Sequence, residues 1–326
     1  MKIGIVFAGQ GAQYSGMGKD LYDAYPEAKQ VFDLAGEQVK EWCFNGDEDT
    51  LKETHITQPT IYTTTMAAYE SLMAAIKNEG LEDKLEVVAL AGFSLGEYSA
   101  LTAAGAIDEY SKGIDIVAKR GIFMKEAGQD ADGNNMGAMA AGLGKRDKIL
   151  ELVEMAREDG ILEGVNFNSP KQTVVAGDKA AIERFCAVAA ENRVKAIPLS
   201  VSTAFHSPMM VPAAERLKDV LAAADLKAPK MTVYADATAD DIMKDAGDDA
   251  AAHLVEMLAK QAMSPVYWEE ILGRFADNGV EAIVEVGPGH TLSGLAKKTL
   301  KGVEPLNVEN VETLEATIAK LKEMAE

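Results

Sequence analysis

A serine in a glycine-bracketed turn is the residue of this sequence that most clearly indicates chemistry. The sequence GFSLG at residues 92–96 follows a strand-like run, Val87–Ala91, and precedes a helix-like run, Glu97–Ala104. In that setting the glycines permit a sharp turn that holds the hydroxyl of Ser94 clear of the backbone. The N-terminus of the helix directs N–H groups toward developing negative charge. We therefore predict that Ser94 is a nucleophile that carries acyl groups; the alternative is a glycine-rich turn with an incidental serine.

A second glycine-rich turn, GQGAQ at residues 9–13, follows the first strand-like run of the chain. A dinucleotide-binding fingerprint would need glycine at position 14, where Tyr14 stands, so the pattern argues against dinucleotide binding. Turns at the carboxyl ends of parallel strands are nonetheless where open α/β sheets bind ligands. The backbone of this turn could supply one N–H of an oxyanion hole and Leu95 the other, a point that spacing alone leaves open.

Four histidines are available as the base that would activate Ser94. His253 lies in a helical run and is more typical of a packing or surface residue. His206 follows the strand-like run Lys195–Ser202 and precedes a Ser-Pro pair, which is typical of the start of a helix. This position places His206 at the carboxyl end of a strand, where a base could meet the serine. We therefore favour His206 as the base, with His290 as the next candidate.

Arg120 is unusual because it lies on an apolar stripe of a predicted helix. No Asp or Glu lies three or four positions away to form a local ion pair. Such an arginine either extends its charged end to solvent or pairs with an anion. The anion could be a carboxylate from elsewhere in the chain, or a substrate carboxylate, which a planar guanidinium binds with two hydrogen bonds. The apolar neighbours are Ile116, Val117, Phe123 and Met124.

Composition narrows the classes of protein. The chain of 326 residues is 48% hydrophobic and 26% charged, as in a soluble globular protein, and its net charge is −20. So acidic a surface repels nucleic acid and anionic membranes, so we expect neither as a partner. The apolar run Ile3–Ala8 is too short for a signal peptide, and no run approaches the roughly 18 residues of a membrane span. Cys43 and Cys186 lie far apart without metal-ligand spacing, so we expect a reduced, cytoplasmic protein with no metal or prosthetic group.

Strand-like runs alternate with helix-like runs along the chain, which predicts an α/β fold with a largely parallel sheet. The middle differs, because segment 136–200 reads strand, helix, strand, strand, helix, strand. That order, βαββαβ, is the ferredoxin-like arrangement. We therefore expect a large α/β domain formed by residues 1–130 and 200–326, with residues 131–199 inserted as a small domain. The strands of the insert are expected near 137–141, 161–166, 172–176 and 194–200, and its helices near 146–158 and 179–191.

Ordered blocks over almost the whole chain resemble the malonyl-CoA:acyl carrier protein transacylases, enzymes that load malonyl groups for fatty acid synthesis. The blocks are GQGAQ (9–13), GFSLGEYSAL (92–101), Arg120 in a Lys-Arg-Gly context, VNFNSP (165–170), AFHS (204–207), Gln261 before Pro265-Val266, and EVGPG (285–289). The resemblance implies a hydrolase-like α/β domain that carries a ferredoxin-like insert. It also implies malonyl-CoA and acyl carrier protein as the binding partners.

The resemblance assigns a role to each matching residue. Ser94 would be the nucleophile and His206 the general base, a dyad without a triad carboxylate. Arg120 would bind the malonyl carboxylate, and the backbone N–H groups of Gln10 and Leu95 would form the oxyanion hole. The residue that orients the histidine, largely through its backbone carbonyl, would be Gln261. These roles predict transfer of malonyl from malonyl-CoA to the phosphopantetheine thiol of the carrier by ping-pong kinetics.

Two positions bear on specificity. Many family members have histidine before the nucleophile, whereas this chain has Phe93, from which we expect altered packing rather than lost activity. Phe205 matches the malonyl-selecting version of related polyketide acyltransferases and should crowd an α-methyl group.

Three alternative functions remain: an esterase or thioesterase with an acidic third member, a polyketide acyltransferase, and a catalytically silent carrier-binding module.

The carrier proteins of this family are typically acidic, so docking on an acidic chain would need a local basic patch. Either of two clusters could supply it, and for each the alternative is a solvated face. The clusters are Lys297, Lys298 and Lys301, and Lys145, Arg146 and Lys148.

Overall fold

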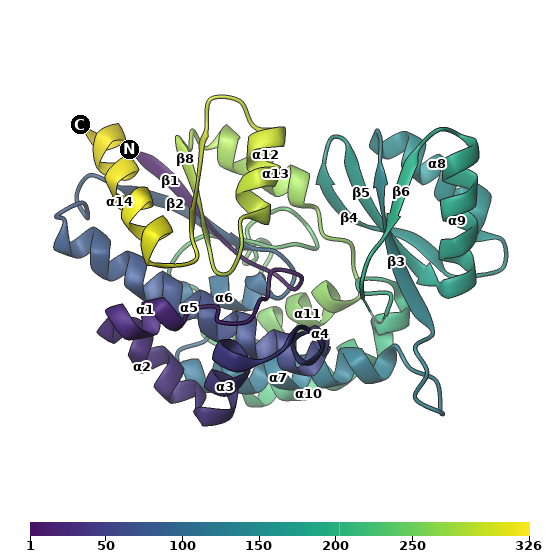
Figure 1. The fold of residues 1–326 in the computed structure, drawn as a ribbon, viewed down its shortest axis with the longest axis horizontal. Helices are drawn as coiled ribbons and strands as arrows, with labels where there is room; N and C mark the ends of the chain where they lie inside the picture. Colours follow the sequence, from purple (N-terminus) through teal and green to yellow (C-terminus); the bar gives the residue numbers. More distant parts are fainter. Residues whose placement is uncertain (202) are drawn as a thin grey trace.

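A five-stranded sheet forms the centre of the larger part of the molecule (Figure 1). The computed structural model describes residues 1–201 and 203–326. All neighbouring strands of this sheet are parallel, which confirms the predicted α/β class. In spatial order the strands are β7 (Val233–Tyr234), β2 (Glu86–Gly92), β1 (Lys2–Phe7), β8 (Ala282–Val286) and β9 (Glu304–Val308).

The strands end level with one another at their carboxyl ends. Phe7 pairs with Gly92 of β2 on one side and with Val286 of β8 on the other. On the next strand outward, Ala91 pairs with Tyr234. The turns that follow β1, β2, β7 and β8 therefore meet at one edge of the sheet, the place where open α/β sheets bind ligands.

Alternate side chains of β1 enter different hydrophobic cores. Ile5 and Phe7 belong to the core that includes α5 (Thr54–Asn78), whereas Val6 belongs to the core formed with α12 (Trp268–Asp277). This alternation follows from the two-residue period of a strand. A strand covered on both faces needs apolar residues throughout, which explains the uninterrupted apolar run of β1.

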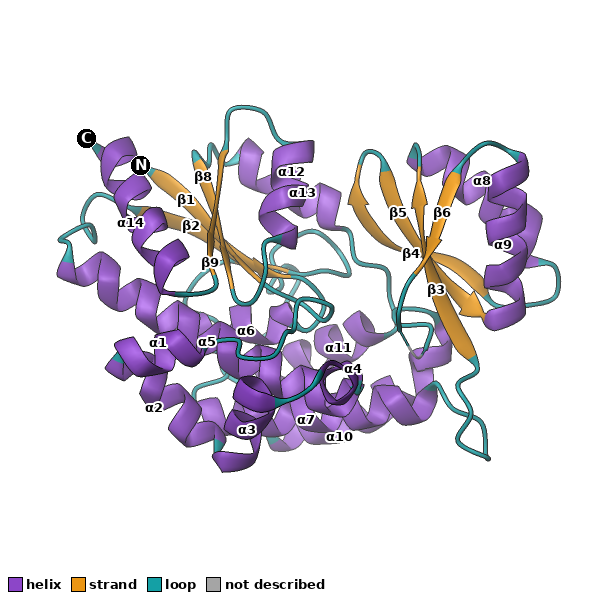
Figure 2. Ribbon diagram, viewed as in Figure 1, coloured by secondary structure: helices purple, strands orange, loops and turns teal. Residues whose placement is uncertain are grey.

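The long helix α5 is buried along most of its 25 residues and passes beneath the sheet (Figure 2). Threonines fill much of its buried surface, so its apolar periodicity is weak and the sequence analysis did not identify it. The other helices of this part are α1 (Lys19–Ala24), α2 (Pro26–Ala35), α3 (Glu37–Asn45), α4 (Glu48–Lys52), α6 (Gly96–Ala103), α7 (Tyr110–Ala127), α10 (Val211–Ala223), α11 (Ala250–Ala262), α13 (Thr291–Thr299) and α14 (Val311–Ala325), with the 3-10 helix η1 (Pro208–Met210).

A four-stranded antiparallel sheet lies to one side of the parallel sheet (Figures 1 and 2). Its elements follow one another as β3, α8, β4, β5, α9 and β6, the predicted order βαββαβ. The predicted run Lys195–Ser202 is shorter in the structure, since β6 ends at Pro198, and residue 202 lies outside the described residues. The elements are β3 (Gly137–Leu143), α8 (Arg146–Arg157), β4 (Leu162–Ser169), β5 (Gln172–Asp178), α9 (Lys179–Glu191) and β6 (Lys195–Pro198), in the spatial strand order β4-β5-β3-β6.

The two faces of the antiparallel sheet have different neighbours. One face packs against α8 and α9, where Ile149 and Phe185 are fully buried. The other face contributes Met139 and Val174 to a core that includes Phe205. The second face is therefore turned toward the carboxyl edge of the parallel sheet. Among the described residues, no helix combines the length and apolar composition that crossing a membrane requires.

Candidate active site

Ser94 lies in the turn between β2 and α6, with φ of 53° in the left-handed region that is costly for residues other than glycine. The flanking glycines make this turn possible. A Cβ atom on Gly92 would lie 1.9 Å from the backbone of Gly96, and one on Gly96 would lie 2.2 Å from the carbonyl oxygen of Phe7. The predicted strand–turn–helix setting is therefore present, and it puts the serine hydroxyl at the carboxyl edge of the sheet.

His206 contacts Ser94 directly, with 2.7 Å between Nε2 and Oγ. Its other ring nitrogen, Nδ1, lies 3.0 Å from the carbonyl oxygen of Gln261 and 3.1 Å from that of Ser264. Because both neighbours of Nδ1 can only accept, we assign the proton to Nδ1, which leaves Nε2 as an acceptor for the serine hydroxyl. Among the described residues, no carboxylate hydrogen-bonds to the ring, so backbone carbonyls take the place of a triad acid.

The imidazole of His206 is held neutral. Burial and the positive charge of Arg120 lower its pKa to about 4, against the opposing effect of the carbonyl groups of Gln261 and Ser264. At neutral pH the ring is therefore unprotonated and able to accept a proton.

The position of His206 in the fold differs from the prediction that it lies at the carboxyl end of a strand. His206 lies beyond β6, which belongs to the antiparallel sheet, and its φ is 61°. The predicted helix start after it is present, because the side chain of Ser207 accepts the N–H of Met209 and caps η1. The other candidate base, His290, precedes α13 and is not among the residues that line the cavity around Ser94.

Arg120 on α7 is 1% exposed, and none of its partners in the described structure is a carboxylate. It donates to Gln58 Oε1 at 3.0 Å, to Ser94 Oγ at 3.2 Å and to Gln261 Oε1 at 3.1 Å. Its guanidinium carbon also lies 5.3 Å from the ring centre of Tyr98. Among the described residues no Asp or Glu forms a salt bridge with it, although its charge acts on the buried carboxyl groups of Glu97 and Asp236. A buried guanidinium of this kind favours an incoming anion.

Gln261 connects the members of the site. Its backbone carbonyl accepts from His206, as the resemblance implied. Its side chain adds contacts that the sequence analysis did not foresee, because Nε2 donates to the carbonyl oxygen of Ser94 at 2.6 Å while Oε1 accepts from Arg120. One residue at the end of α11 thus fixes the positions of serine, histidine and arginine together.

The turn 9–13 after β1 lies against the turn that holds Ser94. A Cβ on Gly9 would lie 2.4 Å from the carbonyl oxygen of Phe93, so the two turns are in backbone contact. Gln10 lines the same cavity as Ser94, and Leu95 is the N-cap of α6. The backbone at both predicted oxyanion positions is therefore next to the serine.

A cavity of about 320 Å³ surrounds these groups. Its wall comes from the parallel sheet edge and from the inner face of the antiparallel sheet, a mostly apolar lining with a few convergent polar groups, as in ligand sites. Residues from both parts line it: Gln10, Ser94, Arg120, Asn166, Asn168, Gln172, Val174, Phe205 and His206. Among the described residues, no group of three His, Cys, Asp or Glu side chains could hold a metal ion.

Two residues of the site were missed by the sequence analysis. Gln58 lies on α5, which has weak periodicity, so nothing in the sequence marked it. Asp236 follows β7 and accepts the backbone N–H of Ser94 at 2.6 Å. A signal for Asp236 existed, because a polar residue at the end of a short β-rich run is a usual place for a site residue in an α/β fold.

The two predicted basic clusters differ in whether their side chains form salt bridges. Arg146 pairs with Glu269 and Glu270, and Lys148 pairs with Glu151. By contrast, Lys297 and Lys298 are exposed on α13, and among the described residues neither forms a salt bridge.

The fold and the site together define a serine acyl-transfer enzyme. In a parallel α/β sheet, a serine on a strand-to-helix turn contacts a neutral histidine and a buried arginine through its hydroxyl. Comparison with known proteins agrees. Residues 5–318 match the acyl transferase domain. The malonyl CoA-acyl carrier protein transacylase of Bacillus subtilis is 40% identical over 329 residues, covering 99% of this chain and 98% of its own. The chain therefore belongs to the acyl transferase domain family, among the malonyl CoA-acyl carrier protein transacylases.

Solved structures extend this result. The crystal structure of malonyl CoA-acyl carrier protein transacylase from Clostridium perfringens matches with a TM-score of 0.88 and 38% identity, covering 99% of this chain and 98% of that one. A malonyl-transacylase in complex with its type II PKS acyl-carrier protein matches with a TM-score of 0.88 and 31% identity, covering 98% of this chain and 100% of that one.

Proposed function

We propose that this chain transfers malonyl from malonyl-CoA to the phosphopantetheine thiol of an acyl carrier protein in fatty acid synthesis, through a malonyl ester on Ser94. The similarity to malonyl CoA-acyl carrier protein transacylases along the whole chain supports the reaction. The observation that carries it is that the hydroxyl of Ser94 lies between a neutral histidine, His206, and a buried arginine, Arg120, and that this arginine forms no salt bridge among the described residues.

The first half-reaction makes the ester. His206 Nε2 takes the proton of Ser94 Oγ as that oxygen attacks the thioester carbonyl of malonyl-CoA. The negative charge on the carbonyl oxygen is stabilised by the backbone N–H groups of Gln10 and Leu95. When the C–S bond breaks, the proton on His206 passes to the CoA thiolate, and the ring is neutral again. Gln261 holds Nδ1 throughout, which keeps Nε2 toward the serine.

Arg120 selects the acyl group. A malonyl group on Ser94 ends in a carboxylate, and the guanidinium can bind it with two parallel hydrogen bonds. Binding gives the guanidinium a directly hydrogen-bonded anion, which none of its present hydrogen-bond acceptors is. An acetyl group offers no such carboxylate.

The second half-reaction releases the malonyl group. His206 takes the proton of the carrier's phosphopantetheine thiol, the sulfur attacks the malonyl ester, and Ser94 Oγ recovers the proton as the ester bond breaks. The two half-reactions use one site in turn, so the kinetics are ping-pong. The chain's own residues make each proton transfer, and the proposal assigns no metal or prosthetic group to the enzyme itself.

The same proposal includes the finer description of the fold and location. The large domain, residues 1–130 and 200–326, is hydrolase-like, and residues 131–199 form a ferredoxin-like insert that covers the sheet edge. The free cysteines Cys43 and Cys186 agree with a reducing, cytoplasmic location. A polyketide carrier is the second candidate acceptor, because a similar malonyl-transacylase was solved with a type II PKS acyl-carrier protein.

The test is intact-mass spectrometry of the protein after incubation with malonyl-CoA. The wild type should gain one malonyl group, and Ser94→Ala should gain none. Ser99→Ala is the matched control, because Ser99 is a buried serine on α6, the helix that follows the Ser94 turn, and should leave the adduct unchanged. Loss of the adduct on addition of holo-carrier, with a malonyl-carrier product, supports transfer. A wild type that gains no adduct refutes the proposal, and loss of the adduct to water alone indicates a thioesterase.

A further inference from the structure

Ser94 has a strained backbone that something must hold in place. Its φ of 53° lies in the left-handed region, which is unfavourable for serine and persists only where the surroundings impose it. The carboxyl oxygen Oδ2 of Asp236 accepts the N–H of Ser94 at 2.6 Å. We propose that Asp236 is a positioning residue for the nucleophile, which it holds by accepting this N–H. The inference rests on the proposed role of Ser94.

Asp236 reaches Ser94 because of the strand order. It follows β7, which pairs in parallel with β2, and Ser94 follows β2. The ends of adjacent parallel strands face one another, so a side chain after β7 meets the backbone after β2. Asp236 is fully buried, and so is Glu97, whose Oε2 accepts the backbone N–H of Asp236 at 2.6 Å. Two hydrogen bonds therefore join the nucleophile turn to the segment after β7, and each segment donates one backbone N–H to a carboxyl group of the other.

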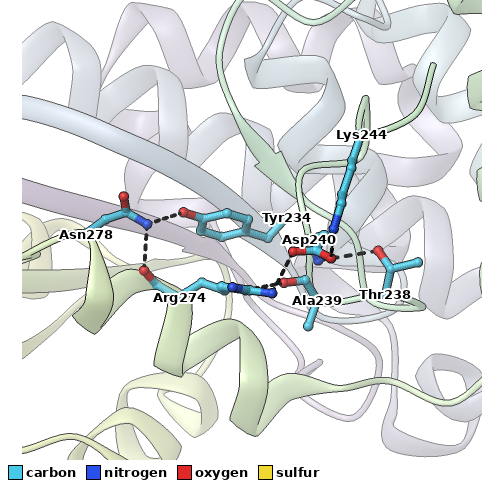
Figure 3. A network of polar contacts seen from close by, with 7 residues as sticks. All are labelled: Tyr234, Thr238, Ala239, Asp240, Lys244, Arg274 and Asn278. Carbon is cyan, nitrogen blue, oxygen red and sulfur yellow. Dashed lines mark hydrogen bonds and ion pairs between the residues drawn. The ribbon is translucent and has the colours of Figure 1, made fainter. Parts of the chain in front are cut away.

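The segment that carries Asp236 is anchored on both sides, to α12 and to Asn278, the residue that follows this helix (Figure 3). Before it, the hydroxyl of Tyr234 accepts from Asn278 Nδ2 at 2.9 Å. After it, Arg274 donates to the carbonyl oxygen of Ala239 at 3.1 Å and to Asp240 Oδ1 at 2.6 Å. Figure 3 shows these contacts as one continuous network, in which Lys244 also pairs with Asp240. This anchoring lets the carboxyl group act as a fixed point rather than a mobile side chain.

The same carboxyl oxygen also reaches the rest of the site. Asp236 Oδ2 accepts from Gln261 Nε2 at 3.1 Å. That amide nitrogen donates to the carbonyl oxygen of Ser94 as well, so Asp236 and Gln261 hold the N–H and the C=O of the serine. Because Gln261 also contacts His206 and Arg120, loss of Asp236 should disturb the alignment of all three groups.

The hydrogen-bond acceptor, rather than the charge, is what the proposal requires. Burial raises the pKa of Asp236 to about 7, against the opposing hydrogen bonds from Ser94 and Gln261 and the charge of Arg120. Neutral and ionised carboxyl groups both retain an acceptor oxygen, and so does the amide of asparagine. Asp236→Asn should therefore keep the function that Asp236→Ala loses.

The experiment measures the single-turnover rate of Ser94 malonylation at saturating malonyl-CoA, together with the half-saturating malonyl-CoA concentration. We expect D236N to remain within about threefold of the wild type. We expect D236A to lose at least about tenfold in rate with little change in half-saturation, because a shift of about 1 Å in a reacting group costs on the order of 100-fold. Asp178→Ala is the matched control, since Asp178 Oδ2 likewise accepts a backbone N–H, that of Ile161 at 2.7 Å, in the antiparallel sheet. It should leave the rate unchanged.

Rates are compared per folded molecule, with thermal unfolding measured on each variant. If D236A does not fold, Asp236→Ser makes the same comparison with an oxygen that is one bond too short. A wild-type rate in D236A or D236S overturns the proposal, and so does a D236N rate as low as that of D236A. A wild type that forms no malonyl adduct instead refutes the proposed function, so the two failures are distinguishable.

Discussion

Replacing Arg120 with alanine should remove malonyl selectivity while leaving the nucleophile and base in place. Arg120 is 1% exposed, and its terminal nitrogen Nη2 donates to both Ser94 Oγ and Gln261 Oε1. Two charge-assisted hydrogen bonds to a malonyl carboxylate are worth about 1.5–3 kcal/mol each, or about 3–6 kcal/mol together. Each 1.4 kcal/mol is about tenfold in rate. Because the carboxylate must also lose its water, we expect the lower end, a loss of about 100-fold in kcat/KM for malonyl-CoA.

Acetyl-CoA provides the internal comparison, because it has no carboxylate to lose. Arg120→Ala should change its kcat/KM by only a few fold, so the ratio of malonyl to acetyl activity should fall by about the same 100-fold. Arg120→Lys should give an intermediate ratio, since lysine keeps the charge but not the planar pair of donors. Lys119→Ala is the matched control: Lys119 is the neighbouring cation on α7, pairs with Asp115 at the surface, and should change neither substrate.

The assay is release of CoA at about pH 8, well above the usual histidine pKa. This choice matters because the charge of Arg120 lowers the pKa of His206, and its removal raises that pKa. A measurement at low pH would mix the two effects. Equal losses on malonyl-CoA and acetyl-CoA would refute the reasoning, because they would mean that Arg120 serves only to position Ser94.

Three further predictions concern the base, the acyl pocket and the carrier. Because the pKa of His206 is lowered to about 4, kcat/KM for malonyl-CoA should stay level down to about pH 5 and fall only below it; a fall centred near the usual histidine value would contradict this. Phe205 lines the cavity, so Phe205→Ser should raise methylmalonyl-CoA activity relative to malonyl-CoA by about tenfold or more, and an unchanged ratio would show that its ring does not exclude the methyl group. Replacing both Lys297 and Lys298 with glutamate should raise KM for the carrier and weaken its salt dependence without slowing Ser94 malonylation; unchanged carrier kinetics would exclude α13 as the docking surface.

Local sequence was enough for the elements whose signals are short-range. The apolar run of β1 and the strand, turn and helix around Ser94 are set by residues within a few positions of one another. The βαββαβ order of the insert was also predicted, because each of its elements has its own periodic pattern. By contrast, α5 was missed, since its burial on nearly all sides and its threonines remove the one-sided apolar pattern.

For the site, the residue types and their local patterns identify the chemically competent side chains: a serine on a bent turn, an arginine on an apolar stripe and a few histidines. Position along the chain could only rank His206 above His290, because these histidines come from separate segments. The structure decided that His206, 112 residues from Ser94, meets it. It likewise decided that Asp236 and Gln58 belong to the site. Hydrogen bonds are made over about 3 Å, and only the packing of two sheets edge to face brings distant segments within that range.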